Sequence, residues 1–344
     1  MKFLHFFKEF LVKRIPVYYL ILILLIFEGG NYYFLKQYAL ANNSQNPQKI
    51  EYNTCLTKMS QVRTKDLKFA HPLLLTDIPN ESEDFFTLKN EINTFIESKK
   101  SIGEISNASV YFRKLNDGSW MNINGNEGFH PGSLIKIPIL LTYLKYAESN
   151  PSLLNKQIKY EKAFSNMPNQ EYPDKMIQLG KSYKANELLE AMIENSDNAA
   201  TMLLIQNVNM NGFKKLFTDI GLPEPPENDP NFSISAVDVS KFFRVLYSST
   251  YLNTTGSEYA LTLLSKSTFQ IGIANAIPKE ISIVHKFGEQ GTPLGKELHE
   301  VAIIYLKDSP YLLTIMTQGK DMNKLPPILS EISKITYNHF NTNM

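Results

Sequence analysis

The chain of 344 residues, 43% of them hydrophobic and 12% aromatic, is long enough to bury a sizeable core as one large domain or two small ones. Its 35 basic and 34 acidic residues leave a formal net charge of +1, so charge does not indicate a nucleic-acid partner, and a small neutral or zwitterionic substrate is more natural. The single cysteine excludes an internal disulfide and a cysteine-rich zinc site, and no two of the six histidines have metal-site spacing, so no metal or other cofactor is expected.

Residues 1–41 have the features of a membrane-directed segment. Four basic residues precede Ile15–Phe27, an almost unbroken apolar run. Two interpretations stay open: a signal peptide cleaved near Ala39–Ala41, which would make the protein secreted, and an uncleaved N-terminal anchor helix. Because the possible cleavage site lies far beyond the apolar run, we favour the anchor. The positive-inside rule then leaves the rest of the chain outside the cytoplasmic membrane.

The next segment, residues 42–80, is predicted to be a polar tether, since its first part is rich in Asn, Gln and Ser. A globular domain is expected over residues 81–344. Apolar residues at helical spacing predict a first helix over 84–99. Strands are predicted over 108–115 and 120–124, because the Asp117-Gly118 pair between them is a strong hairpin signal.

The middle of the chain, from about 135 to 278, is predicted to be mostly helical, most clearly over 135–148, 185–195, 199–207 and 236–247. Strand signals return at 282–287, 301–306 and 311–317, and a last helix is predicted over 325–340. These elements predict an α/β (α+β) fold. Its antiparallel sheet would be built from both chain ends and flanked by helices, with an all-helical lobe inserted between the ends.

Ser133 and Lys136 form the only S-x-x-K pattern in the chain. Residues three apart lie on one face of a helix, so the Ser133 hydroxyl and the Lys136 amine should meet. A serine becomes a nucleophile when a neutral amine accepts its proton, and a helix N-terminus favours the oxyanion of a reacting carbonyl. The pattern therefore indicates acyl transfer, although an ordinary helix start followed by a surface lysine has the same sequence.

Two further motifs follow in order. Ser196-Asp197-Asn198 lies at a break between two predicted helices, where it could equally be a helix N-cap. Lys286-Phe287-Gly288 ends a predicted strand and means little alone. Together with Ser133 and Lys136, they make the chain resemble the serine β-lactamase and DD-peptidase (penicillin-binding protein) superfamily, class A β-lactamases most closely, over about 84–340.

The resemblance implies a role for each matching residue. Ser133 would be the acylated nucleophile and Lys136 its base, while Ser196 would pass a proton to the departing amine. Lys286 would hold a cation near Ser196 and the substrate carboxylate. The remaining positions would bind substrate: Asn198 through its amide, Gly288 through close approach of its strand, and Glu289 through a backbone N–H that completes the oxyanion site.

Two departures from the family pattern bear on activity. Phe287 stands where the family has Thr or Ser, whose hydroxyl helps to bind the substrate carboxylate. The class A deacylation base lies in an E-x-x-L-N pattern, and here Glu227 and Asn231 share the spacing without the leucine. Glu227 is thus a weak candidate, and it could equally be a solvated turn carboxylate. The Lys136-Ile137-Pro138 sequence resembles class D enzymes, but their S-x-V motif is missing.

Three functions follow from the resemblance, in order of preference. The first is a membrane-anchored serine hydrolase that opens β-lactams through an acyl-serine intermediate. The second is a D-alanyl-D-alanine carboxypeptidase or transpeptidase that acts on peptidoglycan stem peptides. The third is a non-catalytic binding protein on the same scaffold. All three imply a small-molecule or peptide ligand and no nucleic-acid partner.

Overall fold

The computed structural model describes residues 59–64, 67–165, 167, 170–172, 175–226, 229, 232–292 and 295–341. The apolar run at 15–27, the possible cleavage site at 39–41 and the candidate base Glu227 lie outside these residues. Within the described residues, no helix is long and apolar enough to cross a membrane.

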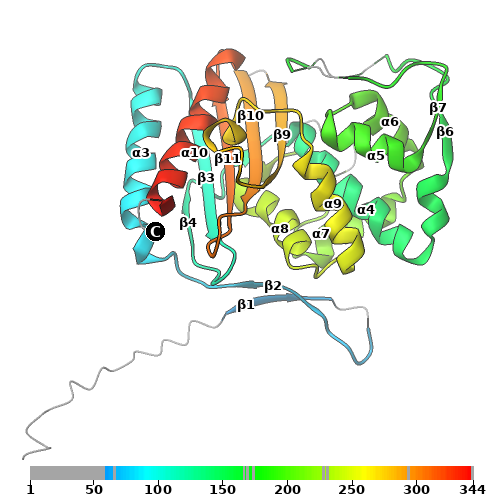
Figure 1. The fold of residues 1–344 in the computed structure, drawn as a ribbon, viewed down its shortest axis with the longest axis horizontal. Helices are drawn as coiled ribbons and strands as arrows, with labels where there is room; N and C mark the ends of the chain where they lie inside the picture. The colour runs from blue at the N-terminus through cyan, green and yellow to red at the C-terminus, as the bar shows by residue number, and fades with distance from the viewer. Residues whose placement is uncertain are drawn as a thin grey trace, which may run out of the picture. The chain divides into compact units, whose positions relative to one another are not determined.

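A five-stranded antiparallel sheet forms the centre of the fold, and both chain ends contribute to it (Figure 1). The strand order is β4 (Trp120–Ile123), β3 (Asn107–Lys114), β11 (Tyr311–Gly319), β10 (Gly295–Ile304) and β9 (Ile283–Thr292). Gly118 adopts a left-handed φ of +79° in the β3–β4 turn, as the Asp-Gly signal predicted. The expected mixed fold with an antiparallel sheet is thus confirmed.

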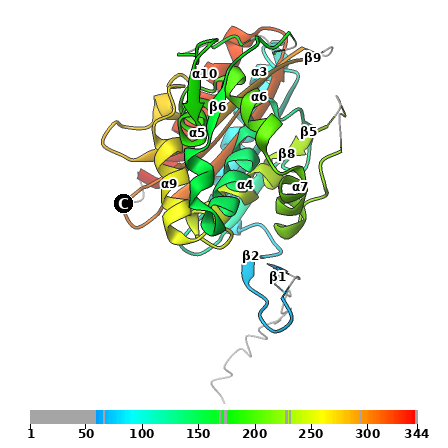
Figure 2. The same cartoon turned by 90° about the vertical axis from the view of Figure 1, so that its right-hand side faces the viewer.

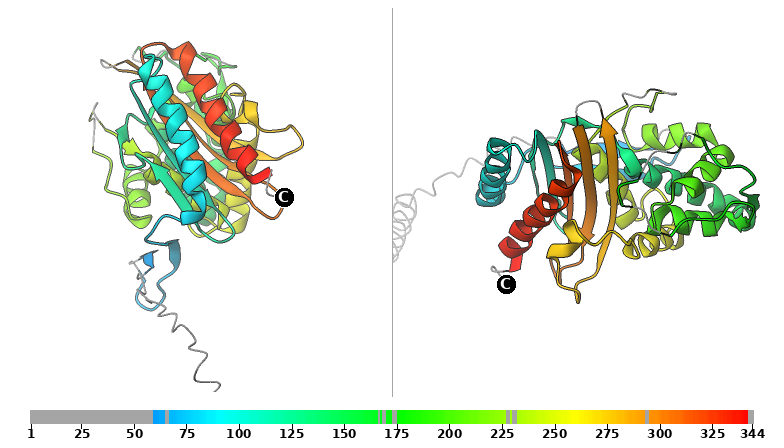
Figure 3. Two further views of the ribbon diagram at one scale, coloured as in Figure 1. Left: turned by 90° about the vertical axis from the view of Figure 1, so that its left-hand side faces the viewer. Right: turned by 90° about the horizontal axis from the view of Figure 1, so that it is seen from above.

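Helices cover both faces of this sheet. On one face α3 (Phe86–Ser101) and α10 (Leu325–Asn341) lie side by side (Figure 3). On the other face α8 (Ala236–Tyr247) packs against β11, β3 and β10. Side chains alternate across each strand, so Leu298 and Ala302 join the α3–α10 core while Val301 and Ile303 join the opposite core.

The remaining helices form the inserted lobe beyond β9, where Figures 1 and 2 show them together. They are α4 (Lys136–Ser149), α5 (Ala185–Glu194), α6 (Asn198–Asn207), α7 (Met210–Asp219) and α9 (Thr254–Ser265). Short 3₁₀ helices are η1 (Glu83–Phe85), η2 (Gly132–Ile135), η3 (Pro151–Asn155), η4 (Ile273–Ala276) and η5 (Met322–Lys324). The fold also contains two small antiparallel pairs: β5 (Gly128–Phe129) with β8 (Ile234–Ser235), and β6 (Gln157–Lys159) with β7 (Ser182–Lys184).

Two of the predicted strands differ from the observed ones. The strand expected at 282–287 continues to Thr292, and the one expected at 301–306 begins at Gly295 and ends at Ile304. The added residues include Glu289, Gln290 and Glu297, which are weak strand formers. Backbone pairing between β9 and β10 outweighs this low strand propensity. As a result, β9 extends along the site described below.

The tether expected over 42–80 ends earlier than the sequence indicated, because an additional hairpin lies within it. Strands β1 (Ser60–Arg63) and β2 (Leu73–Asp77) pair antiparallel, and the Leu74 and Leu75 side chains are buried in the core on the α8 face of the sheet. Strands β1 and β2 have only four and five residues, too few for a clear alternation of polar and apolar side chains. Packing against the domain therefore decides this structure more than the local sequence does.

Candidate active site

The Ser133 turn joins the sheet to the lobe. Ser133 lies in the 3₁₀ helix η2, and the α-helix α4 begins only at Lys136, so the predicted α-helical turn is wrong in type. The predicted shared face survives this correction, since a 3₁₀ helix has 3.0 residues per turn and places residues three apart in line. Both side chains line one cavity of about 320 Å³.

Two glycines let this turn approach strand β9 closely. A Cβ atom on Gly132 would lie 2.5 Å from the backbone oxygen of Glu289, and Gly132 has a φ of +49°. A Cβ atom on Gly288 would lie 2.7 Å from the backbone oxygen of Pro131. Real side chains do not tolerate such distances, so both positions require glycine. The close approach brings the backbone of Glu289 against Gly132, the residue before Ser133.

Lys136 is almost completely buried and makes three hydrogen bonds. Its Nζ donates to the Ser196 backbone oxygen at 2.5 Å, to Ser196 Oγ at 3.0 Å and to Asn198 Oδ1 at 2.8 Å. Burial lowers the pKa of Lys136 to about 7, although nearby Asp197 and Glu289 act in the opposite direction. Near neutral pH, a sizeable fraction of this amine is therefore unprotonated and able to accept a proton.

Ser196 Oγ connects the two lysines. It accepts from Lys136 Nζ and from Lys286 Nζ, both at 3.0 Å, so its own proton remains available to a third group. Burial, followed by the nearby ammonium group of Lys136, holds the pKa of Lys286 well below its usual range. The hydroxyl can thus take a proton from a lysine on one side while it gives one away on the other.

The local sequence explains how Ser196 reaches this position. Asp197 is the N-cap of α6, since its Oδ1 accepts from the Ala200 N–H at 2.9 Å, and its Oδ2 accepts from the Ile177 N–H at 2.6 Å. Ser196 itself has a φ of +54°, which is uncommon for a residue other than glycine. The N-cap interpretation of this motif is therefore correct, and the same cap places Ser196 against both lysines.

The structure brings all seven predicted site residues together. Ser133, Lys136, Asn198 and Glu289 line the cavity, while Ser196 and Lys286 are fully buried directly behind Lys136, and Gly288 packs against the Ser133 turn. The bonds from Lys136 and Lys286 to Ser196 are compatible with the proton-transfer roles that the resemblance implied, and all seven roles stay predictions. Glu227 lies outside the described residues, but Asp229 of the same loop lines the cavity.

Sequence reasoning missed residues 170–172, which contact Ser196 and Glu289. Gln170 Nε2 donates to the Ser196 backbone oxygen at 2.9 Å. The carboxylate of Glu289 accepts from the N–H groups of Glu171 at 3.1 Å and Tyr172 at 3.4 Å, and burial raises its pKa. The sequence predicted a role only for the Glu289 backbone. No local pattern marks residues 170–172, because their partners lie far away in the chain.

Phe287 faces away from the cavity. Its side chain is 3% exposed and stacks on Phe269 with ring centres 4.2 Å apart, on the α3–α10 side of β9. Lys286 Nζ lies 4.3 Å from the centre of the Phe287 ring. The sequence raised the question of whether Phe287 replaces a hydroxyl that contacts substrate. The structure instead favours a core residue that also supports Lys286.

Comparison with known proteins identifies the family. The family model described as β-lactamase enzyme family matches residues 87–340, which is most of the chain. The chain belongs to the β-lactamase enzyme family. The predicted superfamily and the prediction of a serine hydrolase are therefore both confirmed. No curated protein matches the chain.

Solved structures of this family share the fold. PBP-A superimposes with a TM-score of 0.65 at 19% identity, covering 77% of this chain and 99% of its own. A point mutant of PBP-A, solved as an acyl-enzyme complex with penicillin G, gives the same TM-score and identity over 77% and 100%. A class A β-lactamase from Mycobacterium abscessus gives 0.62 at 20% identity over 74% and 99%. At such identities the likeness shows the fold alone.

Proposed function

We propose that this serine hydrolase opens β-lactams in the manner of class A enzymes, with Ser133 as the nucleophile. The observation that carries the proposal is the buried Lys136 amine, whose pKa near 7 lets it act as a base. Asn198 bonds Lys136 and borders the cavity, which supports a role in binding the substrate's amide side chain. Membership of the family supports acyl-serine chemistry. The hydrogen bonds among Lys136, Ser196 and Asn198 support a part for these residues in that chemistry.

We infer the acylation step from the resemblance together with the Lys136–Ser196–Lys286 network. Neutral Lys136 takes the proton of Ser133 as Ser133 Oγ forms a bond to the lactam carbonyl carbon. The ring C–N bond then breaks. Ser196 gives its proton to the departing nitrogen and regains one from Lys136, so the proton lost by Ser133 ends on the product amine. The N–H groups of Ser133 and Glu289 would stabilise the oxyanion, a contribution of about 3–4 kcal/mol per donor in other enzymes.

Deacylation separates the two leading functions. A hydrolase needs a base that activates water against the acyl-serine ester, and Asp229 and Glu227 belong to the loop that could supply it. Phe287 gives no hydroxyl to a substrate carboxylate, and because β-lactams and D-alanyl-D-alanine termini both carry one, position 287 does not separate these two functions. The intact Lys136–Ser196–Lys286 network argues against a non-catalytic binding protein.

Intact-protein mass spectrometry with a penicillin over time tests the proposal. A transient adduct of the penicillin mass indicates a hydrolase, and a lasting adduct indicates a penicillin-binding protein. No adduct would support the third function, a binding protein without acyl transfer. The Ser133→Ala variant is the control, since it should show no adduct under any condition.

We further propose that the protein is anchored in the cytoplasmic membrane with its catalytic domain outside. The basic residues before Ile15 and the apolar run to Phe27 support this location. A reporter fused after Met344 that is active only outside the cytoplasm would agree with it. Activity of a reporter that works only in the cytoplasm would contradict it.

A further inference from the structure

Exposed apolar side chains gather on the β1–β2 hairpin, outside the catalytic site. Phe69 is 85% exposed and Leu67 is 51% exposed, and Met59 and Leu73 are also exposed. These four lie within one stretch of 15 residues, whereas the other exposed large apolar side chains of the described residues are spread between Phe86 and Ile271. A concentration of this kind usually marks a surface for contact with a partner.

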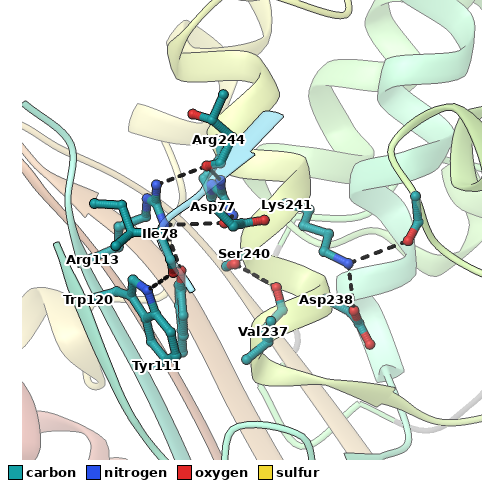
Figure 4. A network of polar contacts seen from close by, with 12 residues as sticks. Asp77, Ile78, Tyr111, Arg113, Trp120, Val237, Asp238, Ser240, Lys241 and Arg244 are labelled. Atoms are coloured by element: carbon teal, nitrogen blue, oxygen red, sulfur yellow. Dashed lines mark hydrogen bonds and ion pairs between the residues drawn. The ribbon is translucent and has the colours of Figure 1, made fainter. Parts of the chain in front are cut away.

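The base of the hairpin is firmly attached to the domain. The guanidinium groups of Arg113 and Arg244 donate to the Thr76 backbone oxygen at 3.1 and 2.7 Å, and both pair with Asp77 Oδ1, at 3.3 and 2.8 Å (Figure 4). Both arginines are buried. Such charge-assisted bonds are about twice as strong as neutral ones, so they fix the end of β2 against the sheet and α8.

Two more bonds hold the strand on either side of this clamp. Trp120 Nε1 donates to the Ile78 backbone oxygen at 2.7 Å, and Thr250 Oγ1 donates to the Leu74 backbone oxygen at 2.8 Å. Figures 1 and 2 show β1 and β2 at one end of the domain, outside the sheet and the helical layers. These bonds fix β2 on the domain, and the described residues of the tip, 64 and 67–72, directly precede that strand.

The excess of basic residues over 59–73 favours a partner with negative charge. Residues 59–73 contain three basic residues, Arg63, Lys65 and Lys68, against one acidic residue, Asp66. Lys68 Nζ lies 4.9 Å from the centre of the Phe69 ring. Aromatic and aliphatic side chains next to lysines are the composition of segments that lie in the headgroup region of anionic bilayers. A purely apolar protein groove would not need these cations.

The position of the hairpin in the chain favours the same partner. Only residues 28–58, a stretch of 31, separate the apolar run that ends at Phe27 from Met59. A tether of that length would span about 30 Å on average. An N-terminal anchor would thus keep the start of the hairpin within about 30 Å of the bilayer on average.

We propose that the tip of the β1–β2 hairpin rests on the surface of an anionic phospholipid bilayer and so sets the orientation of the catalytic domain. Leu67 and Phe69 enter the headgroup region, and Lys68 contacts lipid phosphate. Because Arg113 and Arg244 bond Thr76 and Asp77, the sheet and α8 take the same orientation relative to the bilayer as the hairpin.

A fluorescence experiment on the full chain tests the proposal separately from the N-terminal anchor and from catalysis. In a Cys55→Ser background, a polarity-sensitive label is attached at Ala70→Cys, which keeps Phe69, or at Leu179→Cys, an exposed position in the lobe. The protein is bound to phosphatidylcholine vesicles with or without phosphatidylglycerol. We expect the label at 70 to be quenched by lipid nitroxide and shielded from iodide, most strongly with phosphatidylglycerol. The label at 179 should stay accessible to iodide.

Variants of the tip give the matched controls. Leu67→Ser with Phe69→Ser should abolish the shielding at position 70, and Lys68→Glu should remove its dependence on phosphatidylglycerol. Equal iodide access at 70 and 179 in a chain that floats with the vesicles would overturn the proposal. Shielding at 70 without any lipid would also overturn it, because the tip would then be covered by protein.

Discussion

Phe287→Thr restores the residue type that the family motif has at this position, and the structure predicts that it damages the protein. The Phe287 ring is buried against Phe269 with an interplanar angle of 15°. Truncation of a buried phenylalanine costs about 3–5 kcal/mol, and a threonine hydroxyl without a partner adds to that cost. In a domain of this size, each kcal/mol lowers Tm by about 2–4 °C, so we expect a fall of about 6–20 °C.

The same variant should acylate no faster than the wild type. The Phe287 ring lies 4.3 Å from Lys286 Nζ, and its attraction of about 0.5–2 kcal/mol to the protonated form of that amine is lost with threonine. Thermal denaturation and the acylation rate with one penicillin measure the two effects. Phe287→Leu is the matched control, since it keeps an apolar side chain of similar volume and should cost less than about 1.5 kcal/mol.

The opposite result would refute this reasoning. If Phe287→Thr kept the wild-type Tm and acylated about tenfold faster, a gain of about 1.4 kcal/mol, its side chain would have to reach the substrate. A double-mutant cycle with Phe269→Leu provides a second check. The two rings should couple by about 0.5–1.5 kcal/mol if they pack as the structure shows.

The remaining predictions concern the cavity. Ser133→Ala should lose all covalent labelling by a penicillin probe with an unchanged Tm, and persistent labelling would move the nucleophile elsewhere. Lys136→Ala should slow acylation by about 10²–10⁴, the usual effect of removing a positioned base. Since the active form of Lys136 is unprotonated and its pKa is about 7, the wild-type acylation rate should rise with pH up to about 7 and level off above it; a flat profile from pH 5 to 8 would exclude this base. Gly288→Ala should abolish acylation because its Cβ would meet the Pro131 oxygen at 2.7 Å, whereas Gly291→Ala, with only the end of a lysine side chain at 3.8 Å, should acylate normally.

The motifs and the larger elements could be predicted because their signals are local. Helical spacing of apolar residues marks α3 and α10, and the Asp117-Gly118 turn marks the β3–β4 hairpin. The order of Ser133, Ser196 and Lys286 along the chain was enough to indicate acyl-serine chemistry. None of these inferences required knowledge of which residues meet in space.

Tertiary structure decided what each of these residues contacts. Phe287 directly follows the catalytic lysine candidate in sequence, but the pleat of β9 and the packing of Phe269 turn its ring to the opposite side of the sheet. The low pKa of Lys136 comes from burial between elements that are distant in the chain. The β1–β2 hairpin is held on the domain by Arg113 and Arg244, from β3 and α8, which bond Thr76 and Asp77. Such long-range contacts leave no periodic trace in the sequence, so only the folded chain reveals them.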